Sequence, residues 1–166
     1  LVGPSGKVYA IEADPSCCRR IEKLKKILNL DNLIIIHVAA GSKEDNVKLS
    51  QEENEMSNRI INDKNSQNNF IEVKQKRLDK ILEPFNENKI DYIKSNIEGA
   101  EIDLLKGLNK SKLLIKNFCI SCHDFKGINY KSYDFVRTWL EESGYTVSNY
   151  KPHNPKTIWR NYYLFK

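Results

Sequence analysis

The sequence has no apolar run that approaches the ~20 residues of a membrane-spanning helix, so we expect no transmembrane span. It also has no internal repeat, and its basic and acidic residues are interleaved along most of its length. The net charge of +5 is therefore expected on solvated helix faces, with no nucleic-acid patch. With 40% hydrophobic and 30% charged residues, the 166-residue chain is predicted to be a soluble globular protein with a single domain over residues 1–166.

Cysteine is scarce, with four residues at positions 17, 18, 119 and 122. An adjacent pair and a C-x-x-C pair differ from the disulfide frameworks of secreted proteins, which favours a reducing compartment such as the cytoplasm. The stretch NFCISCHDF (117–125) has the C-x-x-C-H spacing of a haem attachment site. However, it belongs to an apolar, strand-like run, and side chains three apart on a strand point to opposite faces. This favours small core residues over a haem or zinc site, and we expect no metal.

Strand and helix patterns alternate along the chain. Asp14 is a plausible N-cap and Pro15 a plausible first helical residue, ahead of apolar residues at helical spacing up to about Asn29. Gly144 is a good residue to follow the last helix. The predicted strands lie in 8–12, 32–40, 113–123, 145–150 and 157–166, and the predicted helices in 15–29 and 130–144. Residues 70–82 are predicted to form a strand that runs into a short helix, and residues 89–108 a strand, a turn and a helix that begins near Gly99.

This order predicts an α/β fold with an open, twisted, mostly parallel sheet, helices on both faces and a C-terminal antiparallel strand pair. The first strand, helix and second strand would form one right-handed crossover unit. Residues 46–69 are polar and rich in Asn, so we expect a long loop with at most one short strand. Such a loop is either a lid over a ligand or a surface insertion.

Polar side chains follow several of the predicted strands. Glu12 ends the first, His37 lies near the end of the second, Asn96 and Glu98 follow a later one, and His123 with Asp124 follows the next. Each alone fits a solvated loop residue or a helix cap equally well. Because ligands bind beyond the carboxyl ends of the strands in open α/β sheets, we expect the set to converge on one site.

Five segments, GPSGKVYAIEADP, NLIIIHVAAGS, RLDKIL, IDYIKSNIEGAE and ISCHDF, occur in the order and spacing of the FkbM-like methyltransferases, which the chain resembles from Gly3 to about Phe125. These are AdoMet-dependent enzymes with the class I, Rossmann-like fold. The most specific segment, IKSNIEGAE, is similar to the family's I-K-x-D-x-E-G-A-E. The resemblance implies an AdoMet-dependent methyltransferase with a small-molecule or glycan acceptor.

The chain departs from the family in two ways. The family's Asp in the specific segment is Asn96 here. The family's first strand and its glycine-rich loop would precede Leu1, so the sheet is expected to lack its central strand, between the strands that end at Glu12 and Asn96. We therefore expect an N-terminally incomplete domain from a longer gene product, because a missing central strand leaves two apolar edges unpaired.

The resemblance implies a cofactor site formed by Glu12, Ala39, Ala40 and Asn96. Glu12 would accept hydrogen bonds from both ribose hydroxyls, which suits a carboxylate with two oxygens but serves NAD equally well. Ala39 and Ala40 would lie near the adenine, where small residues permit close approach, although they also fit a simple tight turn.

If the acceptor is a hydroxyl, as the resemblance implies, a base must take its proton. His123 is the preferred candidate because imidazole titrates near neutral pH. Glu98 and Glu101 are alternatives, and both also fit the role of acids at a helix start. Asn96 cannot act as a base.

Two rival interpretations stay open. A nicotinamide-dependent oxidoreductase would need a G-x-G-x-x-G loop, which the sequence lacks. A truncated, non-catalytic relic or binding module of the same fold would fit Asn96 and the missing strand.

Overall fold

The computed structural model describes residues 2–51, 58–61, 69–109, 111–123, 132–150 and 161–165. In this part of the chain, four α-helices accompany parallel and antiparallel strands, which confirms the predicted α/β class. The chain divides into two compact units. The first comprises residues 1–40 and 44–76, and the second comprises residues 41–43 and 77–166. Each unit has buried apolar residues of its own.

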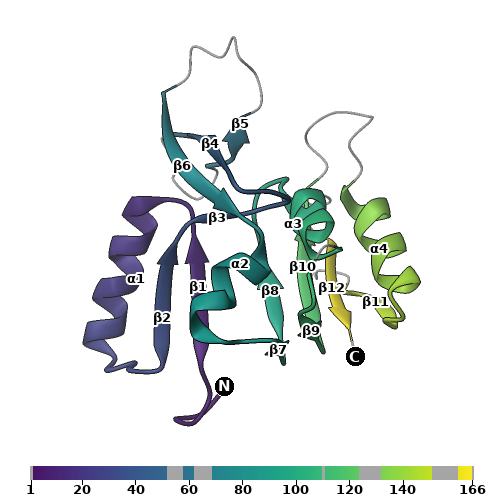
Figure 1. Cartoon of the computed structure of the whole chain (residues 1–166), viewed down its shortest axis with the longest axis horizontal. Coiled ribbons are helices and arrows are strands. Elements are labelled where there is room, and N and C mark those ends of the chain that lie inside the picture. Colours follow the sequence, from purple (N-terminus) through teal and green to yellow (C-terminus); the bar gives the residue numbers. More distant parts are fainter. Residues whose placement is uncertain are drawn as a thin grey trace. The chain divides into compact units, whose positions relative to one another are not determined.

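The first unit begins with the predicted crossover. Strand β1 (Val8–Glu12), helix α1 (Pro15–Ile27) and strand β2 (Leu33–His37) follow one another, and β1 pairs with β2 in parallel (Figure 1). The register places Glu12 opposite His37, so the two strands end side by side. The predicted strand–helix–strand unit is therefore confirmed.

Helix α1 starts as the sequence predicts but buries a different residue. Asp14 is its N-cap and Pro15 its first residue. The only buried residue of α1 is Cys18, whereas Leu24 and Leu28, in the predicted apolar stripe, are exposed. An apolar stripe identifies the face that can pack, but burial requires a neighbouring element to cover it.

A small second sheet follows β2. Its strand order is β3-β6-β4-β5, with β3 parallel to β6 and β4 antiparallel to both β5 and β6. Its strands are β3 (Ala39–Ala40), β4 (Asp45–Ser50), β5 (Ile60–Ile61) and β6 (Phe70–Lys76). The prediction of a long loop with at most one short strand over residues 46–69 is thus wrong in its number of strands, because residues 46–50 belong to β4 and residues 60–61 form β5. Residues 52–57 and 62–68 lie outside the described residues.

The second unit contains a four-stranded sheet of order β11-β12-β10-β8. β8 (Ile93–Ser95) and β10 (Phe118–Cys122) are parallel, and β12 (Asn161–Phe165) is antiparallel to both β10 and β11 (Val147–Tyr150). The predicted C-terminal antiparallel pair is confirmed.

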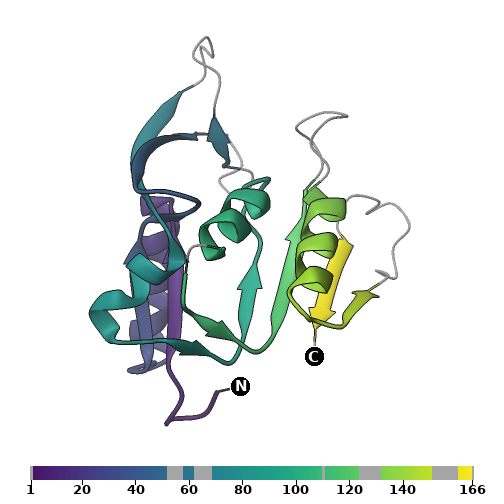
Figure 2. The ribbon, with the colours of Figure 1, turned by 45° about the vertical axis from the view of Figure 1, so that its right-hand side comes forward.

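Helix α4 (Ser132–Glu142) packs against β10 (Figure 2). The fully buried ring of Phe118 meets Trp139 and Tyr145 edge to face, with centroid distances of 6.1 and 5.2 Å. Such edge contacts stabilise aromatic pairs beyond the area that they bury. The aromatic cluster therefore fixes α4 on the sheet that carries the end of β10.

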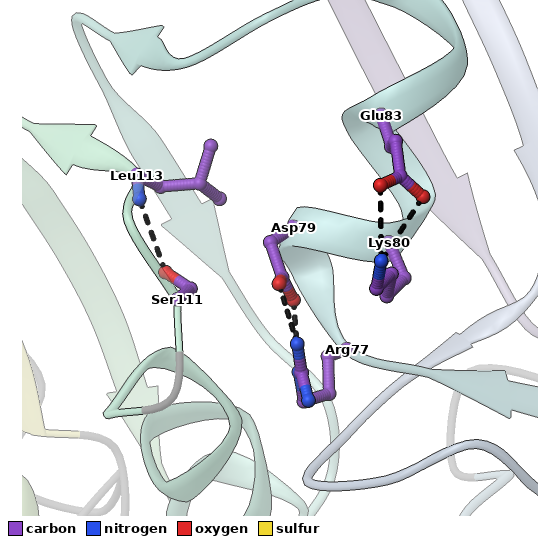
Figure 3. A network of polar contacts seen from close by, with 6 residues as sticks. All are labelled: Arg77, Asp79, Lys80, Glu83, Ser111 and Leu113. Carbon is purple, nitrogen blue, oxygen red and sulfur yellow. Dashed lines mark hydrogen bonds and ion pairs between the residues drawn. The ribbon is translucent and has the colours of Figure 1, made fainter.

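Helix α2 (Leu78–Leu82) is anchored at its start by an ion pair. Arg77 donates from Nε and Nη2 to the two carboxylate oxygens of Asp79, at 3.0 and 2.6 Å (Figure 3). Hydrogen bonding and charge from Arg77 lower the pKa of Asp79. The same view shows the exposed Lys80–Glu83 pair, at 2.9 Å, and Ser111 Oγ accepting from the Leu113 N–H.

The remaining elements of the second unit are a short 3-10 helix, η2 (Glu83–Phe85), helix α3 (Glu101–Leu108), and the parallel pair β7 (Lys89–Ile90) and β9 (Leu114–Ile115). Among the described residues, β1 pairs only with β2, and β8 pairs only with β10. Each of these strands therefore keeps one free edge. No helix in the described ranges has the length and apolar character needed to span a membrane.

Candidate functional site

A buried histidine–carboxylate pair lies at the end of β10. His123 follows the strand directly and is 1% exposed. Its Nδ1 lies 2.7 Å from Oε1 of Glu101, the first residue of α3, which is 0% exposed. The two residues are 22 positions apart in the sequence and come from neighbouring parts of the second unit. The fold therefore withdraws both ionisable groups from water together.

The turn between β8 and α3 shapes the rest of this cluster. Glu98 and Gly99 both have positive φ, 46° and 91°, so the backbone turns through the left-handed region twice in succession. For Glu98 this conformation costs roughly 1–3 kcal/mol, which the surrounding contacts must offset. The turn directs the Gly99 N–H to Oε1 of Glu101, at 3.1 Å.

Glu98 lies on the other side of the imidazole. Its Oε1 is 3.6 Å from His123 Nε2 and accepts a hydrogen bond from Asn96 Nδ2 at 3.3 Å. The Glu98 side chain is 13% exposed, so it is the more accessible of the two carboxylates. We call Asn96, Glu98, Glu101 and His123 the acid–base cluster. An imidazole between two carboxylates can accept and hold a proton, which is the chemistry of a general base.

The first unit carries a separate polar group at the end of β1. Glu12 Oε1 accepts a hydrogen bond from the Asp14 N–H at 2.8 Å, while no described residue hydrogen-bonds its other carboxylate oxygen. His37, opposite Glu12 in the register, donates from Nε2 to the Ala13 carbonyl oxygen at 3.0 Å. The Glu12 carboxylate is thus oriented by the backbone and keeps an oxygen for a ligand. This fits a ribose diol, which needs fixed acceptors.

The two alanines expected near the adenine form strand β3. Ala39 is buried in an apolar cluster with Leu49 and Val73, and Ala40 is partly buried. The tight turn considered as their alternative role is not what the structure shows, since both pair with β6. Ala13, next to Glu12, packs against the same cluster. Ala39 and Ala13 therefore belong to one apolar cluster of the first unit.

Both cysteines of the C-x-x-C-H stretch lie in β10, which confirms the strand on which the argument against haem depended. All four cysteines of the chain are free thiols. Burial, aided by the nearby Glu12 charge, raises the pKa of the Cys18 thiol to about 11. The Cys18 Sγ donates to the Glu12 carbonyl oxygen at 3.6 Å, so this thiol supports the end of β1.

Residues 1–147 match the model of the methyltransferase FkbM domain. The chain belongs to this family. A solved structure, the methyltransferase FkbM from Methylobacillus flagellatus KT, is similar with a TM-score of 0.61 and 17% identity. The match covers 96% of this chain but only 36% of that one, and at this identity the likeness shows the fold alone. A comparison with curated proteins found no match.

The FkbM-family motif IKSNIEGAE corresponds to the end of β8, the left-handed turn and the start of α3. The structure brings its Asn96, Glu98 and Glu101 together with His123 in the second unit. Glu12, Ala39 and Ala40 lie in the first unit. Convergence of Glu12 with the acid–base cluster stays a prediction, and Asp124 lies outside the described residues.

Two contacts of this FkbM-family chain were not predicted from the sequence. The first is the role of Glu101 as the partner of His123, since an acid in the first turn of a helix is usually a solvated helix-start residue. The second joins Asn58 Nδ2 to Asp14 Oδ2, at 2.6 Å. The Gly99 that precedes Glu101 by two residues was a usable signal for the first, because a left-handed turn can aim a backbone N–H at a nearby carboxylate.

Proposed function

We propose that the chain is part of an AdoMet-dependent methyltransferase with a Rossmann-like fold, which methylates a hydroxyl group of a sugar, glycan or small natural product. The observation that carries this proposal is the match of residues 1–147 to the methyltransferase FkbM domain. The parallel pairs β1–β2 and β8–β10 support the Rossmann-like fold.

Glu12, Ala39, Ala40 and Asn96 are the residues that would hold AdoMet. When bound, AdoMet would supply an electrophilic methyl group for transfer to the acceptor oxygen. The free oxygen of the Glu12 carboxylate would accept from the ribose hydroxyls, and the fixed Oε1 would hold the carboxylate in place. The Asn96 amide would offer a donor and an acceptor but cannot take a proton.

The acid–base cluster supports O-methylation because a hydroxyl acceptor must lose its proton. We assign this proton to His123, whose imidazole is held by Glu101 and flanked by Glu98. Burial of the cluster excludes bulk water from the base, which strengthens its electrostatic contacts. The four free thiols are compatible with a reducing compartment, and the cytoplasm stays the expected location.

Calorimetric titration of the purified chain with AdoMet tests this function. We expect wild type to bind AdoMet and Glu12→Gln to bind about 10- to 100-fold more weakly, because hydrogen bonds to a charged acceptor contribute ~1.5–3 kcal/mol. Glu22→Gln, an exposed acid on α1, is the matched control and should bind like wild type. Equal affinity of the Glu12 variant would contradict the cofactor site.

The same titration separates the rival interpretations. Binding of NAD in preference to AdoMet would favour an oxidoreductase. Binding of neither would favour a non-catalytic chain. If AdoMet binds, methylation of a sugar and glycan panel with His123→Ala tests the base, and an unchanged rate would remove His123 from this role.

A further inference from the structure

The contacts of Glu101 Oε1 decide which nitrogen of His123 carries hydrogen. This oxygen already accepts from the Gly99 N–H at 3.1 Å, and His123 Nδ1 lies 2.7 Å away. An ionised carboxylate has no hydrogen to donate and only accepts hydrogen bonds. With Glu101 ionised, Nδ1 is therefore the donor in this contact, and the neutral imidazole carries its hydrogen there.

The burial of Glu101 makes this arrangement costly to change. Its side chain is 0% exposed, and its other oxygen, Oε2, is buried with no hydrogen-bond partner among the described residues. The charge of a buried carboxylate must be offset by the groups around it. For Glu101 these are the Gly99 N–H, the start of α3 and the imidazole N–H, so loss of the hydrogen on Nδ1 would remove one of only a few compensating contacts.

We propose that Glu101 is a positioning residue that holds His123 as the Nδ1–H tautomer, so that Nε2 is the nitrogen that takes up a proton. The claim that Nε2 takes up a proton during catalysis rests on the proposed function. The O–H bond of the acceptor breaks, and its proton moves to the Nε2 lone pair, where the Glu98 carboxylate at 3.6 Å stabilises the resulting positive charge. Glu101 itself keeps its hydrogen bond to Nδ1 throughout.

The positioning role of Glu101 distinguishes it from Glu98, the other glutamate that the sequence left as an alternative for the general base. Glu101 is fully buried and bonded to the nitrogen that does not react. Glu98 lies on the reactive side of the ring and is partly exposed. A carboxylate that fixes the tautomer of a catalytic histidine contributes strongly to turnover in other enzymes without touching the substrate.

Nitrogen-15 NMR of the histidine-labelled chain measures the tautomer directly. The chain has three histidines, and His123→Ala identifies the signals of His123 by their loss. We expect a protonated Nδ1 and an unprotonated Nε2 in neutral wild-type His123. A neutral His123 protonated on Nε2 would overturn the proposal without any variant.

Glu101→Leu tests whether Glu101 causes this tautomer. Leucine removes the acceptor for the Nδ1–H, so we expect a shift toward the Nε2–H tautomer. The matched control is Asp103→Leu, at another acid in the first turn of α3, which should keep the wild-type spectrum. An unchanged tautomer in a folded Glu101→Leu chain would overturn the assignment.

Kinetic measurements distinguish a wrong assignment of the His123 tautomer from a wrong proposed function. With an accepted substrate, Glu101→Leu should lower kcat by about 10²- to 10⁴-fold, with little change in the Kd for AdoMet. A loss of AdoMet affinity with unchanged kcat would contradict the positioning role. If the tautomer changes as expected but wild type neither binds AdoMet nor methylates, the proposed function fails while the assignment of the tautomer stands.

Discussion

The Asp14 carboxylate joins two segments of the first unit. Its Oδ1 accepts from the Ser16 and Cys17 N–H groups at the start of α1, at 2.6 and 3.3 Å. Its Oδ2 accepts from Nδ2 of Asn58, which lies two residues before β5. Burial alone would raise the pKa of Asp14, but the hydrogen bonds from Ser16, Asn58 and Cys17 outweigh it, so the pKa lies below its ordinary value of 3.8.

Replacing Asp14 by Ala should lower the free energy of unfolding by about 1–2 kcal/mol at neutral pH, because it removes a helix cap. The depressed pKa means that the carboxylate stabilises the fold fully above its unfolded-state value, near 3.8, and progressively less as pH falls through the lower folded-state value. The difference in the free energy of unfolding between wild type and Asp14→Ala should therefore become smaller in acid. Urea unfolding at about pH 7 and about pH 3 measures this.

Asp31→Ala, at an exposed turn position, is the control and should change stability by less than about 0.5 kcal/mol. If Asp14→Ala lowers the free energy of unfolding by the same amount at both pH values, the stabilisation does not come from the ionised carboxylate. The N-cap itself was predictable from the Asp-Pro sequence at the helix start. The bond to Asn58 was not, because it connects residues 44 positions apart.

At the scale of elements, regular patterns were predictable and short or partly exposed strands were not. The strand–helix pattern of β6 and α2 is continuous and falls where the sequence predicts. The apolar run 32–40 was predicted as one strand, but the structure divides it into β2 and β3, which belong to different sheets. In β4 only Val47 and Leu49 alternate with polar residues, and the segment continues into an Asn-rich stretch. An alternation of two apolar residues is too short to distinguish a strand from a loop.

Glu101 and His123 show the same limit for the site. The sequence placed His123 at the end of a strand and Glu101 at the start of a helix, and the structure has both there. It could not show that the Glu101 side chain turns inward, since that depends on the backbone of the Glu98–Gly99 turn. The candidate residues were therefore predictable from strand order, while their individual roles required the geometry of the turn.

Gly107 shows how closely α3 packs. A Cβ added at Gly107 would collide with the carbonyl oxygen of Gly41. Gly in a helix interior normally costs ~0.5–1 kcal/mol relative to Ala. Here the Gly41 backbone occupies the space that the alanine methyl group would need. We therefore expect Gly107→Ala to lower the free energy of unfolding by about 1–3 kcal/mol.

Chemical denaturation measures this difference. Lys23→Ala, at an exposed position of α1, is the control for the effect of alanine on a helix and should stay within about 0.5 kcal/mol of wild type. A Gly107→Ala chain that is more stable than wild type would contradict close contact between α3 and residue 41.

At the scale of the whole molecule, the sequence predicts one domain over residues 1–166, and the structure divides the chain into two compact units. The division follows the contacts, since Leu49 belongs to the apolar cluster of the small second sheet and Leu105 to the buried face of α3. The order of strands and helices along the sequence does not show where contacts between residues are few enough to divide the chain into units. A single domain therefore stays a prediction.

The two cores give this prediction a direct test. Leu49→Ala and Leu105→Ala each remove a buried side chain, 4% and 0% exposed, and each should cost about 2–5 kcal/mol. If each unit has its own stability, hydrogen exchange should accelerate mainly in β4 and β6 for the first variant and mainly in α3 and β10 for the second. The variants serve as controls for each other. Equal acceleration in all four elements, from either substitution, would show that the chain unfolds as one cooperative domain.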